Sequence, residues 1–213
     1  MITLVPTGLK RVLCLGAHSD DIEIGCGGTV LELIRRHPGI EVYWAVFSGN
    51  ALRRREARAS AHAFLDGAKV RGISTGSFRE SYFPVQWALI KNRFEKLRRE
   101  FAPDLVFTHC RDDRHQDHRV LSDLAWNTFR NHLVLEYEIP KYDGDLGVPN
   151  VFVPLGKDVC GKKIEYLCRF FQTQRNKHWF TEDTFYALLR LRGIECAAES
   201  NYAEAFRGRK LIL

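Results

Sequence analysis

The chain has 213 residues, of which 45% are hydrophobic and 27% charged, a composition typical of a globular protein with a sizeable buried core. No apolar run approaches the roughly 20 residues that span a bilayer, and the N-terminus lacks a signal-peptide pattern. We therefore expect a cytoplasmic protein without a transmembrane segment. Its six cysteines are scattered with no CxxC pair, which favours reduced thiols over a disulfide framework.

The net charge of +6 comes from short basic runs, which we interpret mainly as solvated helix faces. A second interpretation is that the positive charge attracts an anionic substrate, such as a phosphorylated or nucleotide-linked sugar. We expect no nucleic-acid partner, because the chain has no RRM, KH or zinc-finger pattern. The basic runs are 53–55, 91–93, 96–99 and 207–210.

The predicted elements alternate between strands and helices. In chain order they are a strand at 11–16, a helix at 27–37, a strand at 40–47, a helix at 52–65, a short strand beginning at 69–71, a helix at 86–101, a strand at 104–108, a helix at 115–132, a strand at 133–139, a loop at 140–154, and helices at 157–171 and 181–191. This alternation predicts an α/β fold with a Rossmann-like, mostly parallel sheet flanked by helices on both faces. No linker or repeat interrupts it, so we predict a single domain over 1–213.

A first polar motif, Ala17-His-Ser-Asp-Asp21, comes directly after the first predicted strand. Ligands of open α/β sheets bind at this carboxyl edge. The glycine-rich run 25–28 follows, and its spacing matches neither GxGxxG nor a P-loop. We expect it to form a tight turn that brings a helix close to the site.

A second polar motif, 109–118, follows the predicted strand 104–108 and ends in His115-Gln-Asp-His118. Either motif alone could be helix capping or surface histidines. Two strand ends that are each followed at once by His and Asp favour one shared metal site.

Two histidines and one aspartate, with an open position for water, are typical of a catalytic divalent ion. We predict His18, Asp21 and His118 as the ligands. Such an ion lowers the pKa of bound water from ~15.7 towards ~7 and polarises a carbonyl group.

The remaining polar residues of the two motifs supply the other catalytic groups. Asp20 is the predicted general base. His115 lies three positions before His118 and would stabilise an oxyanion or protonate a leaving amine. Asp117 would hold one of the imidazoles in its tautomer.

These motifs resemble those of a known family, the PIG-L/LmbE-like N-deacetylases. Residues 17–29 resemble the family's AHPDD(x)E…GCGGT signature, and 115–118 resembles its HxDH motif. Arg53-Arg-Arg-Glu56 resembles its RxxE motif, and 202–206 resembles a C-terminal motif. The resemblance extends over about 10–135.

The resemblance implies a zinc-dependent hydrolase that removes the acetyl group from an N-acetylated amino sugar. It implies one Zn²⁺ per chain, held by His18, Asp21 and His118, with Asp20 as the base. Ser19 stands where the family usually has Pro, which removes a rigid φ but no functional group, so we expect the metal site to persist.

We predict substrate contacts at Arg53, Asp113 and Tyr142, with specificity in the loops 74–86 and 140–156. The expected partner is a free or conjugated N-acetylated amino sugar, and the basic charge favours an anionic one. The sequence is compatible with a homo-oligomer.

Three alternatives remain open at this point. A two-metal phosphoesterase would need ligands for ions ~3.5–4 Å apart, and the sequence offers one credible set of three ligands. A single-metal hydrolase of another amide or ester bond would use the same residues. A non-catalytic, metal-stabilised glycan-binding module fits less well, because structural zinc sites are usually closed by four Cys or His ligands. The ligand set would also suit Fe²⁺, Mn²⁺ or Co²⁺.

Overall fold

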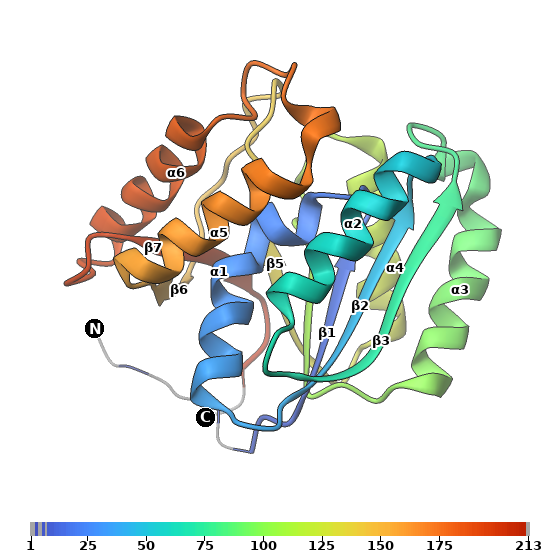
Figure 1. The fold of residues 1–213 in the computed structure, drawn as a ribbon. Helices are drawn as coiled ribbons and strands as arrows, with labels where there is room; N and C mark the ends of the chain where they lie inside the picture. Colours follow the sequence, from blue (N-terminus) through green and yellow to red (C-terminus); the bar gives the residue numbers. More distant parts are fainter. Residues whose placement is uncertain (1–2, 4–5, 7, 212–213) are drawn as a thin grey trace.

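One mixed β-sheet forms the centre of the molecule (Figure 1). The computed structural model describes residues 3, 6 and 8–211, and within them seven strands follow the order β3-β2-β1-β4-β5-β7-β6. The first five strands in this order are parallel, and β7 is antiparallel to both of its neighbours. The strands are β1 Arg11–Gly16, β2 Glu41–Ser48, β3 Lys69–Phe78, β4 Leu105–His109, β5 Leu133–Tyr137, β6 Val151–Pro154 and β7 Ala203–Gly208.

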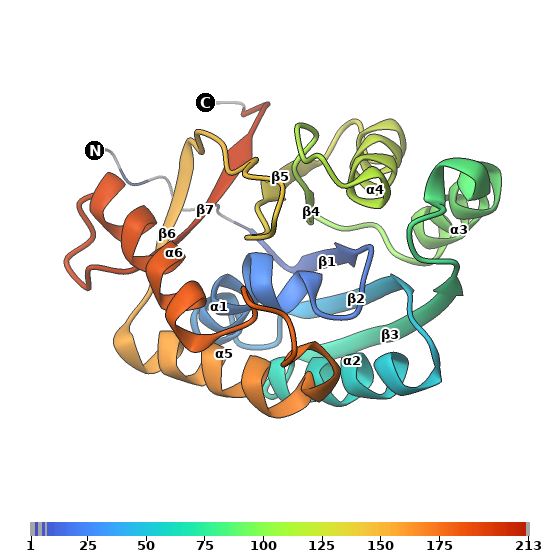
Figure 2. The same cartoon turned by 90° about the horizontal axis from the view of Figure 1, so that it is seen from above.

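Helices cover both faces of this sheet (Figure 2). One face carries α1 Asp21–Arg36, α2 Ala51–Phe64, α5 Lys157–Phe170 and α6 Glu182–Glu195; the other carries α3 Trp87–Glu100 and α4 Gln116–Thr128. Short 3-10 turns, η1 Phe83–Gln86 and η2 Gln172–Gln174, precede α3 and follow α5. None of the helices in the described ranges has the length and apolar character needed to cross a bilayer. The predicted three-layer α/β fold is confirmed.

The central strand β1 is buried on both faces, as expected of a parallel sheet covered on both sides. Val12 and Cys14 belong to the core beneath α1, α2 and α5. The alternate residues Leu13 and Leu15 belong to the core beneath α3 and α4. This two-sided packing fixes the end of β1, where the first polar motif begins.

The glycine-rich run does not form the turn that the sequence predicted. Helix α1 begins at Asp21, so 25–28 lies inside it. A Cβ atom at Gly25 would lie 2.2 Å from the Tyr137 ring, and one at Gly27 would lie 2.7 Å from Phe64. The glycines are therefore needed for close packing of α1 against the sheet and α2, and this packing outweighs their poor helix propensity.

Three strands also differ from the prediction. Strand β3 has ten residues rather than a short beginning at 69–71, and β6 lies within the predicted loop 140–154. No strand was predicted at β7. The strand patterns of the other two are weak because β3 is a partly exposed edge strand with two glycines, and β6 is only four residues long.

A buried ion pair attaches α1 to the C-terminal part of the chain. Glu204 on β7 accepts hydrogen bonds from Gly28 N and Thr29 N, at 2.8 and 2.6 Å. Lys163 on α5 donates to Glu204 at 2.6 Å and to the carbonyl oxygen of Ile24 at 2.7 Å. Since both charged side chains are about 3% exposed, each depends on the other for compensation.

We expect Lys163→Met to lower the free energy of unfolding by about 3–5 kcal/mol, because Glu204 would be left as an unpaired buried charge. The double variant Lys163→Met/Glu204→Gln should recover most of this loss. Urea denaturation measures both, with the exposed neighbour Lys162→Met as control. A single variant as stable as the control would show that the pair does not stabilise the fold.

Candidate metal and catalytic site

The two polar motifs meet at the carboxyl ends of β1 and β4. From this pair of strands, the following strands extend the sheet in opposite directions. Strands β1 and β4 are neighbours, but β1 continues into α1 on one face and β4 leads to α4 on the other. This is the switch point at which α/β sheets bind ligands. The predicted convergence of the two motifs is therefore observed.

The three predicted ligands bring their donor atoms to one point. His18 Nδ1 lies 3.1 Å from His118 Nε2 and 3.3 Å from Asp21 Oδ2, and the last two atoms are 3.6 Å apart. Tetrahedral ligands with bonds of ~2.0–2.2 Å would be roughly 3.3–3.6 Å from one another. The three donor atoms thus fit a single small divalent ion.

In each of the two histidines, a carboxylate contacts one ring nitrogen and leaves the other nitrogen free to bind a metal. Asp117 Oδ2 lies 3.2 Å from His18 Nε2, and Asp113 Oδ2 lies 2.9 Å from His118 Nδ1. A carboxylate only accepts hydrogen bonds, so each ring carries its proton on that side. His18 Nδ1 and His118 Nε2 then face each other, an arrangement that requires positive charge between them, either a proton on His18 Nδ1 or a bound cation.

The electrostatics of the site also favour a cation. Burial by itself lowers the pKa of His18, but the charge of Asp21 and hydrogen bonds to Asp117 and Asp21 raise it to about 10. Burial and the neighbouring His109 lower the pKa of His118 to about 3, so its ring is neutral at physiological pH. The site therefore stabilises positive charge next to a neutral imidazole ligand.

Asp20, the predicted general base, is buried beside this cluster. Its side chain makes no capping hydrogen bond to α1, so helix capping does not explain it. Instead Asp20 Oδ1 accepts from Arg53 at 3.1 Å, and Arg53 also donates to both oxygens of Glu80 at 2.6 and 2.8 Å. Burial raises the pKa of Asp20 even though Arg53 opposes this, which makes the carboxylate a stronger base.

His115 forms the half-buried side of the cluster. Its Nδ1 accepts from Asp117 N at 3.2 Å, so a neutral ring carries its proton on Nε2. Burial and the charge of His18 lower the pKa of His115, which favours this neutral form. The ring lies 4.8 Å from that of His18 and 4.6 Å from that of His118, measured between centroids. His115 is thus placed as a hydrogen-bond donor next to the ligand atoms.

The predicted substrate contacts lie in different surroundings. Arg53 is 8% exposed and its guanidinium group is engaged by Asp20 and Glu80. Asp113 is 3% exposed and faces His118, so the structure places it behind a ligand rather than on an open surface. Tyr142 is 74% exposed in the loop after β5, where a substrate could reach it.

His109, the last residue of β4, has no predicted role from the sequence. Its Nε2 accepts from Ala17 N at 3.0 Å and lies 3.1 Å from Asp21 Oδ2. With Asp21 and His118, His109 forms one of two groups of donor atoms in the described residues that are close enough together for a metal, and the other group is His18, His115 and His118. Because the Ala17 N–H already occupies Nε2 of His109, we favour a supporting role: the ring stacks on His118 at 3.8 Å. The sequence feature that could have identified His109 is its position directly after the predicted strand 104–108.

Comparison with protein families gives one match, over residues 13–129, to PIG-L, described as GlcNAc-PI de-N-acetylase. The chain belongs to the PIG-L family. The matched region contains both polar motifs, and the resemblance of the motifs to this family is confirmed.

Solved structures with the same fold include several deacetylases. N,N'-diacetylchitobiose deacetylase from Pyrococcus horikoshii, in complex with an inhibitor, has a TM-score of 0.74 and 23% identity over 95% of this chain and 84% of that one. The zinc-inhibited form of teicoplanin deacetylase Orf2 has a TM-score of 0.67 and 15% identity, covering 93% and 97%. GalB, the 4-carboxy-2-hydroxymuconate hydratase of Pseudomonas putida KT2440, has a TM-score of 0.68 and 17% identity, covering 96% and 98%. The fold thus supports more than one reaction, and the site residues must decide.

One more acidic residue lies just behind the site. Glu23 on α1 is fully buried, and neither of its carboxyl oxygens has a hydrogen-bond partner within the described residues. Burial raises the pKa of Glu23 well above its usual range, and the charges of Asp20 and Asp21 act in the same direction. The folded protein therefore holds a proton on Glu23 to a higher pH than the unfolded chain, which releases it near pH 4.5.

A raised pKa means that the contribution of Glu23 to stability is fully present below about pH 4.5 and is lost as the pH rises. We expect the stability of the wild type, relative to Glu23→Gln, to fall between pH 5 and 8 by at most about 1.4 kcal/mol per pH unit. Urea denaturation over this range measures the difference, with the exposed Glu165→Gln as control. A difference that does not change with pH would show that Glu23 titrates normally.

Proposed function

We propose that this protein is a metal-dependent N-deacetylase that hydrolyses the acetamide group of an N-acetylated amino sugar or sugar conjugate. The products are acetate and a free amine. The observation that carries the proposal is the convergence of His18 Nδ1, Asp21 Oδ2 and His118 Nε2 within 3.1–3.6 Å, beside the buried carboxylate of Asp20. Membership of the PIG-L family supports the same reaction.

His18, Asp21 and His118 would hold one divalent ion, and zinc suits their nitrogen and oxygen donors. When bound, such an ion lowers the pKa of a water molecule and polarises the acetyl carbonyl group. A structural role for the metal fits poorly, because these three residues leave a coordination position open and Asp20 lies next to it.

Asp20 takes a proton from the attacking water. Arg53 engages its Oδ1, so Oδ2 is the oxygen that accepts this proton. Glu80 holds Arg53 from the solvent side and thereby orients Asp20 indirectly. The burial that raises the pKa of Asp20 serves this role, because a base is most effective when its pKa approaches the working pH.

His115 donates its Nε2–H to the carbonyl oxygen as negative charge develops there. Asp20 then delivers the proton it has taken to the nitrogen of the departing amine. Asp117 orients His18 with its side chain and His115 with its backbone N–H, so one residue positions both a ligand and the hydrogen-bond donor.

The substrate is an amino sugar whose N-acetyl group enters from the side of His115 and Glu80. Tyr142 in the loop after β5 is an exposed contact for the rest of the sugar. The net charge of +6 favours anionic conjugates, such as a nucleotide- or phosphate-linked sugar, over neutral ones.

Wild-type protein should release acetate from at least one of free N-acetylglucosamine, its oligomers, or a nucleotide- or lipid-linked form. A chelator should abolish this release and zinc should restore it. His118→Ala should lose both the metal and the activity, whereas His62→Ala on the exposed side of α2 should lose neither. Elemental analysis and acetate detection measure the two properties. Equal metal content in wild type and His118→Ala would refute the proposed site.

Asp20→Asn should keep the metal but lose about 10²–10⁴-fold in kcat/KM, since it removes the base without removing a ligand. Steady-state kinetics and metal content, measured on the same preparation, separate the two effects. Normal turnover by the metal-loaded Asp20→Asn variant would mean that another group is the base.

A further inference from the structure

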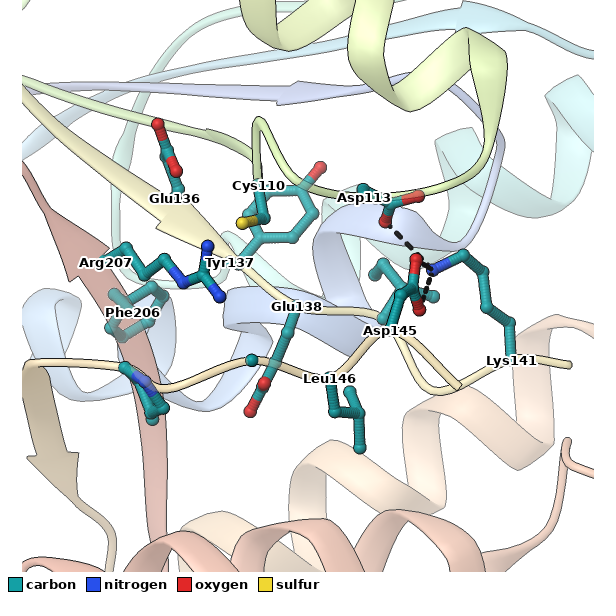
Figure 3. Close-up of a pocket in the computed structure, with 14 residues that line it drawn as sticks. Cys110, Asp113, Glu136, Tyr137, Glu138, Lys141, Asp145, Leu146, Phe206 and Arg207 are labelled. Atoms are coloured by element: carbon teal, nitrogen blue, oxygen red, sulfur yellow. Dashed lines mark hydrogen bonds and ion pairs between the residues drawn. The ribbon is translucent and has the colours of Figure 1, made fainter. Parts of the chain in front are cut away.

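The loop between β5 and β6 is joined to His118 by a row of buried charges. Lys141 Nζ, from this loop, lies 3.1 Å from Asp113 Oδ2 and 2.6 Å from Asp145 Oδ1. The same Asp113 oxygen lies 2.9 Å from His118 Nδ1. The side chains of Lys141, Asp113 and Asp145 are 9, 3 and 7% exposed. Figure 3 shows Lys141 reaching back across the loop to both carboxylates.

The local backbone makes this arrangement specific. Gly144 has a φ of +60°, a conformation that favours glycine, and it allows the loop to return Asp145 to Lys141. Asp145 Oδ2 also accepts from Arg114 N at 2.7 Å, which attaches the loop to the backbone of the second polar motif. The loop is therefore bound to the motif by both a side chain and the backbone.

Asp113 has few other means of keeping its orientation. Its Oδ1 accepts from His115 N at 2.8 Å, and its Oδ2 is shared between His118 and Lys141. A carboxylate buried to this degree needs compensation for its lost hydration, and in the described residues Lys141 is the side-chain cation in contact with it. Lys141 itself cannot be a metal ligand while its ammonium group donates to two carboxylates.

We propose that Lys141 is a positioning residue for the metal centre. It holds the Asp113 carboxylate where that group fixes the His118 ring and its Nδ1–H, so that Nε2 faces Asp21 and His18. Metal affinity then depends on a lysine in the same loop that presents Tyr142 to solvent. The inference rests on the proposed function only in assuming that His118 binds a metal.

Groups that orient metal-binding histidines change metal affinity by 10–100-fold when they are removed. Lys141 acts through Asp113, so we expect Lys141→Met to weaken zinc binding by about tenfold, at the low end of this range. Lys141→Arg, which keeps the charge, should recover most of the affinity. Asp143→Asn, at an exposed position of the same loop, is the matched control.

The experiment is competition with a chromophoric chelator for Zn²⁺, together with visible spectra of the Co²⁺-loaded proteins and ¹⁵N NMR of the His118 ring. A residue that only stabilises the loop would change the melting temperature of the protein but leave the ring tautomer and the Co²⁺ bands unaltered. In the metal-free protein, we expect Lys141→Met to mix the two tautomers of the His118 ring. In the Co²⁺-loaded protein, we expect the same variant to change the Co²⁺ bands. If Lys141→Met does not fold, Lys141→Met/Asp145→Asn removes both buried charges of the loop and serves in its place.

The outcomes distinguish this inference from the proposed function. Wild type that binds no metal would refute the deacetylase site. Wild type that binds zinc, with Lys141→Met equal to it in affinity, spectrum and tautomer, would refute the role of Lys141 alone. Weaker binding that Lys141→Arg recovers, with Asp143→Asn unchanged, would support it.

Discussion

Two imidazole rings can direct lone pairs at one point only if each carries its proton on the opposite nitrogen. In this protein that requirement is met by Asp117 behind His18 and Asp113 behind His118. Backbone N–H groups from neighbouring segments hold these two carboxylates in place. Backbone N–H groups of Ser81 and Phe83 bind Asp117, at 2.6 and 3.1 Å. The segment after β3 thus contributes to the site without contributing a ligand.

Asp20, the proposed general base, is held by a separate set of contacts. Arg53, at the start of α2, contacts Asp20 and Glu80, while Glu56 one turn later accepts two hydrogen bonds from Thr173. The two ends of the RxxE motif therefore have different roles. Arg53 holds the carboxylate of Asp20, and Glu56 attaches the segment after α5 to the same helix.

Much of the fold, and the meeting of the two polar motifs, could be predicted from sequence because both depend on local patterns. Strand–helix alternation implies a parallel sheet, and the carboxyl ends of its strands share one edge, so motifs after β1 and β4 had to meet. The glycine run was misinterpreted because its purpose is contact with Tyr137, more than 100 residues away. Lys141 had no signal of its own: it is a single charged residue in a loop, and its partner Asp113 is identified only by the tertiary fold.

The order of the strands has a consequence for how the chain folds during synthesis. Of the strands in the described residues, β7 comes last along the chain, yet it lies inside the sheet between β5 and β6. Its Glu204 also binds the backbone of α1, the helix that begins with Asp21. A ribosome-bound chain that has already exposed His18, Asp21 and His118, the proposed metal ligands, therefore still lacks a strand from the interior of its sheet. Final assembly of the sheet edge that carries the two polar motifs therefore waits until residues 203–208 have left the ribosome, and loss of these residues removes an interior strand.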